Sequence, residues 1–192
     1  LRRQRQMCIR DSRENNSLVV SIAAGKTTEF IEKLLGFKAP VIRIMPNINA
    51  TVLEAMSAYC CSESVTDDQK EFVNKLCSSF GKVMPLSESY FPLFCSIAGC
   101  APAYAYMFID SLARSAVKNG MNKSVALEIA AQTVLGSAKK ILESDEHPWE
   151  LIDKVCSPGG TTIEGIVSLQ KDGFESAVCN AVDAALQKDK KV

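Results

Sequence analysis

The sequence contains 192 residues, enough for one or two domains with a substantial hydrophobic core. Its 22 basic residues balance its 22 acidic residues, which argues against nucleic acid or an anionic membrane as the main partner. No apolar run approaches the roughly 20 residues of a membrane span, and no secretory signal is evident.

The chain begins with LRRQRQMCIRDS, a basic segment that lacks the apolar periodicity of the residues after it. Two interpretations stay open for residues 1–13: a disordered arm, or a segment foreign to the protein, such as an assembly scar. We favour the foreign segment, partly because of what is missing upstream of the next elements.

Residues 14–89 alternate between strand and helix patterns. A β-branched run, SLVVSIAAG, precedes an amphipathic helix that Gly36 closes, and APVIRIMPNIN repeats the strand-then-loop pattern. The segment TVLEAMSAYCC is compatible with a short strand or a helix. Thr66 then caps a helix with an acidic first turn, and KVMPLSES predicts another strand.

This alternation predicts a parallel sheet with helical crossovers. Such a sheet binds ligands beyond the carboxyl ends of its strands, which is where SIAAG and MPN fall. The dinucleotide fingerprint G-x-G-x-x-G is absent from the sequence. We therefore expect that an amino-terminal part, at least two βαβ units of roughly 30 residues each, has been lost.

Residues 90–192 predict an all-helical domain. A long apolar helix begins near Ala101, with Pro102 suited to its first turn and Gly120 to its carboxyl-terminal cap. The following segment, NKSVALEIAAQTVLGSAKKILES, is apolar around most of its circumference. We expect an intertwined homodimer through this region, with a monomeric bundle as the alternative.

The stretch SPGGTT, residues 157–162, places a glycine pair where a helix begins. Glycines let a ligand approach the backbone closely, and a helix that starts at Thr161 presents unpaired N–H groups and the positive end of its dipole. The hydroxyls of Ser157, Thr161 and Thr162 add donors. This arrangement suits a carboxylate or phosphate, although helix capping alone is sufficient to explain the same residues.

The eight cysteines form no CxxC pair, and His147 is the sole histidine. This pattern argues against a structural zinc site, so no metal is expected, and it favours reduced thiols in a cytoplasmic protein. His147 precedes Pro148, and we interpret it as a helix-entry residue rather than a catalytic one.

Several segments together resemble the pyrroline-5-carboxylate reductase family, in the family's order and from about Leu18 to Leu186. The HP-x-x-L-x-D-x-V-x-SPGGTTI run is the most specific of them. The resemblance implies reduction of the cyclic imine 1-pyrroline-5-carboxylate to L-proline with NADPH or NADH. It also implies a Rossmann dinucleotide-binding domain, whose carboxyl-terminal part would be residues 14–89. Residues 90–192 would then be an all-helical dimerisation and substrate-binding domain, and dimers of this family often assemble into larger rings.

The resemblance also assigns cofactor-binding positions. Three residues after the first strand resemble the loop that passes along the cofactor: Ala23, Ala24 and Gly25. Three residues after the second strand occupy the family's segment near the nicotinamide: Met45, Pro46 and Asn47.

The substrate-binding positions match the family's loop for the substrate carboxylate. They are Ser157, Gly159, Gly160, Thr161 and Thr162. Of these, Thr162 is also a candidate catalytic residue. The second candidate is Cys95, which stands where the family often has a threonine whose hydroxyl reaches the imine nitrogen. A thiol donates more weakly, so a small buried core residue is an equal alternative for Cys95.

Two other classes of protein stay open. A hydroxyacid dehydrogenase of similar architecture would need a catalytic lysine on the central helix, and Lys118 lies near that helix's far end. A non-catalytic dimerisation module would account for the missing glycine-rich segment, whereas the intact SPGGTT loop argues against it. If half of the cofactor site is absent, the isolated chain should dimerise and show little reductase activity.

Overall fold

The structure is a computed structural model that describes residues 11–189. It divides into two compact units, one made of Leu1–Pro102 with Val182–Val192 and the other of Ala103–Ala181. Residues 11–14 form a helical turn, and the rest of the predicted foreign or disordered segment 1–13 lies outside the described range. The division predicted between residues 89 and 90 stays a prediction.

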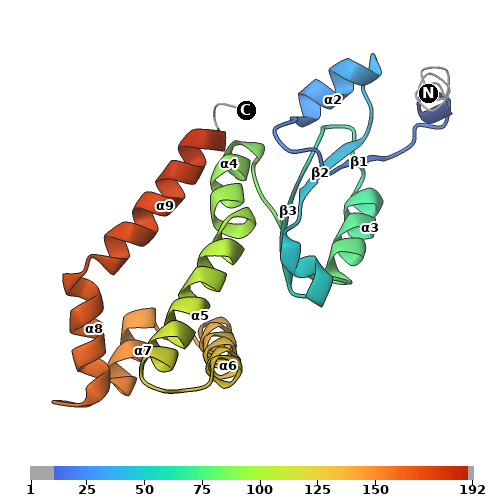
Figure 1. The fold of residues 1–192 in the computed structure, drawn as a ribbon. Coiled ribbons are helices and arrows are strands. Elements are labelled where there is room, and N and C mark those ends of the chain that lie inside the picture. Colours follow the sequence, from blue (N-terminus) through green and yellow to red (C-terminus); the bar gives the residue numbers. More distant parts are fainter. Residues whose placement is uncertain (1–10, 190–192) are drawn as a thin grey trace. The chain divides into compact units, whose positions relative to one another are not determined.

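The first unit contains a four-stranded sheet with the order β1-β2-β3-β4 (Figure 1). Its strands are β1 (Val19–Ser21), β2 (Val41–Met45), β3 (Ala55–Cys61) and β4 (Gly81–Pro85). The segment that could be strand or helix therefore supplies β3.

The sheet is mixed, and the prediction of a wholly parallel sheet is wrong. Strands β1 and β2 are parallel, as are β3 and β4, but β2 and β3 are antiparallel. The connection from Met45 to Ala55 is a short 3₁₀ helix, η1 (Ile48–Val52), followed by Leu53 in the left-handed region at φ 62°. A parallel crossover needs about a dozen residues or more, so this tighter connection reverses the chain.

Two helices accompany the sheet, α2 (Thr28–Leu35) and α3 (Asp67–Ser78). Gly36 closes α2 at φ 75°, and Thr66 caps α3 in a reciprocal capping box with Gln69, so both predicted helix ends are confirmed. The apolar core between α3 and the sheet contains Ile42, Ile44, Tyr59, Val65, Val73 and Cys77.

One continuous helical stretch follows β4. It comprises η2 (Glu88–Tyr90), α4 (Phe91–Phe94), a π-helical turn η3 (Cys95–Gly99) and α5 (Ala101–Lys118). Pro102 is the second residue of α5, in its first turn as predicted, and the helical run extends back from there through the π-turn.

By length and composition, the run Glu88–Lys118 is the one stretch within residues 11–189 that could cross a membrane. The expectation that no apolar run approaches this length is wrong in this respect. Only 6% of its apolar window is buried within the chain. Length and composition do not separate a membrane span from a helix that another apolar surface covers, so the run by itself assigns no environment.

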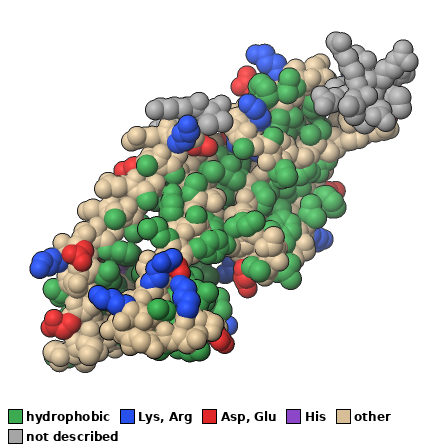
Figure 2. Space-filling model, in the orientation of Figure 1, with side chains coloured by type: hydrophobic (Ala, Val, Ile, Leu, Met, Phe, Trp, Pro, Cys, Tyr) green, Lys and Arg blue, Asp and Glu red, His purple; other side chains and the backbone are tan. Residues whose placement is uncertain are grey.

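The second unit is entirely helical in its described elements. After α5 it contains α6 (Lys123–Leu142), α7 (Pro148–Val155), α8 (Thr161–Lys171) and the first part of α9 (Phe174–Asp189). Its buried apolar residues are three alanines, Ala113, Ala126 and Ala130. Large apolar side chains such as Met107, 75% exposed, and Leu142, 69% exposed, reach the surface instead. Figure 2 shows many such side chains on the visible face. The order of an α/β Rossmann-like part and a helical part is as the sequence predicts.

Candidate active site

The loop after β1 is open to solvent. Ala23, Ala24 and Gly25 are all exposed, and Gly25 adopts φ 68°, a left-handed conformation that disfavours other residues. Nothing lies within 4 Å of the position that a Cβ on Gly25 would take. A ligand can therefore approach this backbone directly, which fits the extended surface of a dinucleotide.

The loop after β2 leaves the sheet at the same edge. Because β1 and β2 are parallel and Ser21 pairs with Arg43, their carboxyl ends lie side by side. The structure thus brings the predicted cofactor segments, 23–25 and 45–47, to one edge of the sheet. In open α/β sheets this edge is where ligands bind.

Asn47 links the loop after β2 to the π-turn. Its Nδ2 donates to the carbonyl oxygen of Ala98 at 3.0 Å, and its Oδ1 accepts from the Met56 N–H at 3.3 Å. Pro102 has no N–H, so the Ala98 carbonyl lacks the donor that an α-helix would supply four residues on. The Asn47 side chain supplies a donor there, and it holds segment 45–47 against the helix that carries Cys95.

Cys95 lies partly buried in the π-turn, a feature that recurs at functional sites. Burial is the main cause that raises the pKa of its thiol, with the nearby Asp189 and Cys100 adding to the effect. Cys95 is therefore a neutral thiol, able to donate a weak hydrogen bond. Its catalytic role stays a prediction, as does the alternative of a small core residue.

The glycine pair of the second unit forms a tight turn. The Gly160 N–H donates to the Ser157 carbonyl at 2.9 Å, and Gly159 adopts φ 67°. A turn with proline second and a positive-φ glycine third is of type II. A Cβ on Gly160 would lie 2.3 Å from Ser157 Oγ, so both glycines are required by geometry.

Helix α8 begins directly after this turn without a side-chain cap. Its N-cap is Gly160, whose lack of a side chain leaves the first N–H groups of the helix free of the capping seen at α2, α3, α6 and α7. Thr161 is exposed, whereas Thr162 is partly buried.

Thr162 also lines a cavity of about 640 Å³ between α6, α7 and α8. The walls are mostly apolar, and the lysines Lys140 and Lys154 contribute to them. Lys154 forms an ion pair with Glu146, while Lys140 has no such partner within residues 11–189. The positive helix end, the threonine hydroxyls and Lys140 all favour an anion.

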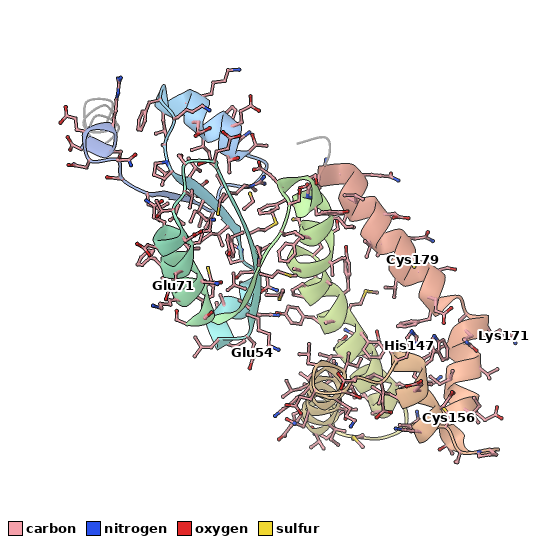
Figure 3. All side chains as sticks on the ribbon, turned by 180° about the vertical axis from the view of Figure 1, so that it is seen from behind. Glu54, Glu71, His147, Cys156, Lys171 and Cys179 are labelled. Atoms are coloured by element: carbon pink, nitrogen blue, oxygen red, sulfur yellow. The ribbon has the colours of Figure 1, made fainter. Side chains whose placement is uncertain are left out.

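His147 has the helix-entry role that its sequence context predicts. Its ring Nδ1 accepts from the Trp149 N–H at 3.2 Å, and its backbone N–H donates to Glu150 Oε2 at 3.2 Å. Figure 3 shows His147 at the start of α7 and Cys156 at its end. The imidazole thus caps α7, and this capping hydrogen bond uses its Nδ1.

Arg43, a buried charged residue of the first unit, is not among the predicted site residues. Arg43 lies in the middle of β2 and is only 5% exposed, and it pairs with Glu88. The signal for it was present, because a charged residue inside the run VIRIM must find a partner if the strand is buried. The sequence did not indicate which partner.

A Rossmann-like sheet with loops at its ligand-binding edge, followed by an all-helical part, is an architecture typical of dinucleotide-binding proteins. Residues 88–192 match the family model for pyrroline-5-carboxylate reductase dimerisation. The Escherichia coli K12 pyrroline-5-carboxylate reductase is 40% identical over 184 residues, which cover 96% of this chain and 68% of that protein.

Solved structures agree with this match. The 1-pyrroline-5-carboxylate reductase from Streptococcus pyogenes superimposes with a TM-score of 0.86 at 40% identity, over 92% of this chain and 68% of that one. The Plasmodium falciparum enzyme, solved with NADP bound, gives a TM-score of 0.86 at 34% identity, over 92% of this chain and 71% of that one. The chain belongs to the pyrroline-5-carboxylate reductase family.

Proposed function

We propose that this protein reduces 1-pyrroline-5-carboxylate to L-proline, with NADPH or NADH as the reductant, as a step of proline biosynthesis. The observation that carries the proposal is the uncapped start of α8 behind the Ser157–Gly160 turn. The substrate is a small anion, and its carboxylate fits the free N–H groups of Thr161 and Thr162 and the hydroxyls beside them. The family relationship supports this assignment of the loop.

The cofactor would lie along the exposed backbone at 23–25, with the nicotinamide near Met45, Pro46 and Asn47. When bound, it supplies the hydride for the C=N carbon. The residues of this chain bind and orient the two molecules, since a fixed carboxylate sets which atom of the ring faces the reductant. The solved relative with bound NADP supports a nicotinamide dinucleotide, and the choice between NADPH and NADH stays a prediction.

A protonated imine is already electrophilic, so the reaction needs no strong general acid. This fits a site whose candidate proton-side contact, Cys95, is a neutral thiol in a partly buried position. Thr162, which faces the cavity of the second unit, contributes a hydroxyl to the substrate side.

The protein is proposed to work as a homodimer. The buried apolar core of the second unit consists of three alanines, and the long α5 leaves large apolar side chains exposed. A second copy would cover them, and the matched family model is a dimerisation domain. Assembly of dimers into rings stays a prediction. The seven described cysteines are free, which supports a reducing, cytoplasmic location.

The test uses the protein expressed from the source reading frame that contains this chain. Loss of NADPH absorbance with 1-pyrroline-5-carboxylate, formation of proline, and a dimer mass by light scattering are the expected results. Oxidation of a 3-hydroxyacid in place of imine reduction would indicate the alternative dehydrogenase. A stable dimer that neither binds the cofactor nor turns over the imine would indicate a non-catalytic module.

A further inference from the structure

The buried guanidinium of Arg43 belongs to a defined polar cluster in the first unit. Its Nη1 donates to Glu88 Oε1 at 3.0 Å, and its guanidinium lies over the ring of Phe91, 4.6 Å from the centroid. A buried charge requires a partner, and both the carboxylate and the aromatic face stabilise the cation. Arg43 thus fixes the side chain of Glu88 from the middle of β2.

The same carboxylate holds the start of α2. The Thr28 N–H donates to Glu88 Oε1 at 2.9 Å, and the Thr28 hydroxyl donates to Oε2 at 3.0 Å. The thiol of Cys60, on β3, lies close enough for the Glu88 carboxylate to help raise its pKa, after burial as the main cause. The three hydrogen bonds from Arg43 and Thr28 use most of the roughly four that two carboxylate oxygens can accept.

Thr28 is the first residue of α2, and its N–H is one of the groups that a helix leaves unpaired at its start. Thr27 caps the helix locally by accepting the Phe30 N–H at 3.1 Å. Glu88 therefore adds a second, anionic cap from 60 residues away in the chain. A negative charge at this end is stabilised by the helix dipole. It occupies the place where an external phosphate would otherwise bind.

The contact of Glu88 with Thr28 fixes the end of the loop that carries Ala23, Ala24 and Gly25. At its other end, the loop leaves β1, where Ser21 pairs with Arg43 itself. Between these two anchors, the loop is exposed and has room on its outer side. A loop held at both ends loses less conformational freedom when a ligand orders it.

We propose that Glu88 is a positioning residue for the cofactor loop: held by Arg43, it fixes the start of α2 and so sets the backbone path of residues 22–27 for the dinucleotide. The inference rests on the proposed function, because it assumes that this loop binds the cofactor. It goes beyond that function in assigning a role to an ion pair inside the first unit, Arg43 with Glu88, that lies outside the predicted site residues.

The decisive variant is Glu88→Gln, in the protein expressed from the source reading frame. The amide keeps the shape of the side chain but replaces one acceptor oxygen by a donor NH₂, which then faces other donors. We expect amide hydrogens at 22–28 to exchange at least about tenfold faster, and the Kd for NADPH, read from cofactor fluorescence, to rise roughly tenfold. The KM for 1-pyrroline-5-carboxylate should stay within about twofold of wild type.

Two controls separate positioning from general destabilisation. Val73→Ala opens a cavity in the core of the same unit, so it should lower the melting temperature and leave the Kd for NADPH unchanged. Glu29→Gln removes a carboxylate from the first turn of α2 and leaves the Arg43–Glu88 ion pair in place. If Glu88→Gln does not fold, Thr28→Val removes a single hydrogen bond to Glu88, and Thr28→Ser restores it.

Unchanged exchange at 22–28 in Glu88→Gln or Thr28→Val overturns the proposal. Faster exchange with an unchanged Kd for NADPH also overturns it, since the cluster would then be structural only. A wild-type protein that binds no NADPH would contradict both the proposed function and the positioning role. NADPH binding without reduction of the imine would contradict the proposed function alone, and both readouts on Glu88 would still apply.

Discussion

Helices α2 and α8 both begin with backbone N–H groups that have no partner within the helix, but the two helices differ in what caps these groups. At α2, the side chain of Thr27 and the carboxylate of Glu88 satisfy the N–H groups. At α8, the N-cap is Gly160, and no side chain caps the helix. Each helix comes after a loop with a positive-φ glycine, Gly25 or Gly159. A helix start is thus a structural contact where the fold supplies its own anion, and it keeps its N–H groups available to a ligand where no side chain caps it.

The comparison also separates two ways in which a glycine-containing loop can serve a ligand. The loop before α2 has an exposed backbone with room around Gly25. The turn before α8 is tight, because Ser157 Oγ fills the space beside Gly160. The first loop suits a long cofactor that lies along its backbone. The second suits a small carboxylate that binds at the start of α8.

The largest effect is expected for Gly160→Ala. The new Cβ would lie 2.3 Å from Ser157 Oγ and 3.0 Å from the Ser157 carbonyl oxygen, so the turn must open and the N–H groups of α8 lose their direction. We expect kcat/KM for 1-pyrroline-5-carboxylate to fall by about 100-fold or more, measured by steady-state NADPH oxidation.

The matched control for this change is Gly165→Ala, inside α8. A Cβ there has nothing within 4 Å, and alanine is the better helix former by about 0.5–1 kcal/mol. It should keep kcat/KM within about twofold of wild type. Equal losses in Gly160→Ala and Gly165→Ala would show that the turn has no special role.

A smaller effect is expected for Thr162→Val, which removes the hydroxyl and keeps the volume. A hydrogen bond to a charged group is worth about 1.5–3 kcal/mol, so kcat/KM for the substrate should fall roughly 10- to 150-fold. Thr162→Ser should recover most of the activity, and Thr161→Val should cost less, since Thr161 does not line the cavity. Activity that survives Thr162→Val unchanged would remove Thr162 from the site.

Thr27→Ala tests whether the two caps of α2 differ in function. It removes the acceptor of the Phe30 N–H and should destabilise the protein by about 1 kcal/mol, measured by urea unfolding. Because Glu88 still holds Thr28, the Kd for NADPH should not change. A weaker affinity for NADPH in Thr27→Ala would mean that the local cap, and not Glu88, sets the loop.

The smallest effect concerns Cys60, whose thiol borders the same cluster. Burial, with the Glu88 carboxylate as the next cause, raises the pKa of Cys60 to about 12. The unfolded thiol releases its proton first, so this residue lowers the stability as the pH rises from about 9 to about 12. In the native protein at about pH 8, iodoacetamide should label exposed Cys179 and spare Cys60. Rapid labelling of Cys60 would contradict a closed cluster around Glu88.

Local features could be predicted from the sequence because their partners lie within a few residues. The cap and capping box of Thr66, the Gly36 helix end and the helix-entry role of His147 are all of this kind. The turn at SPGG is explained by proline and glycine preferences, and the resemblance of this loop to a known family identified the class of protein.

Features that depend on distant partners needed the tertiary structure. The antiparallel step from β2 to β3, the contact of Asn47 with Ala98, and the carboxylate that caps α2 could not be predicted from local patterns. Arg43 and Glu88 are 45 residues apart in the chain, and either could have paired elsewhere. The sequence by itself determined which backbone groups each helix start leaves unpaired. Only the tertiary structure decided which start receives an internal anion, because that depends on which segments fold against it.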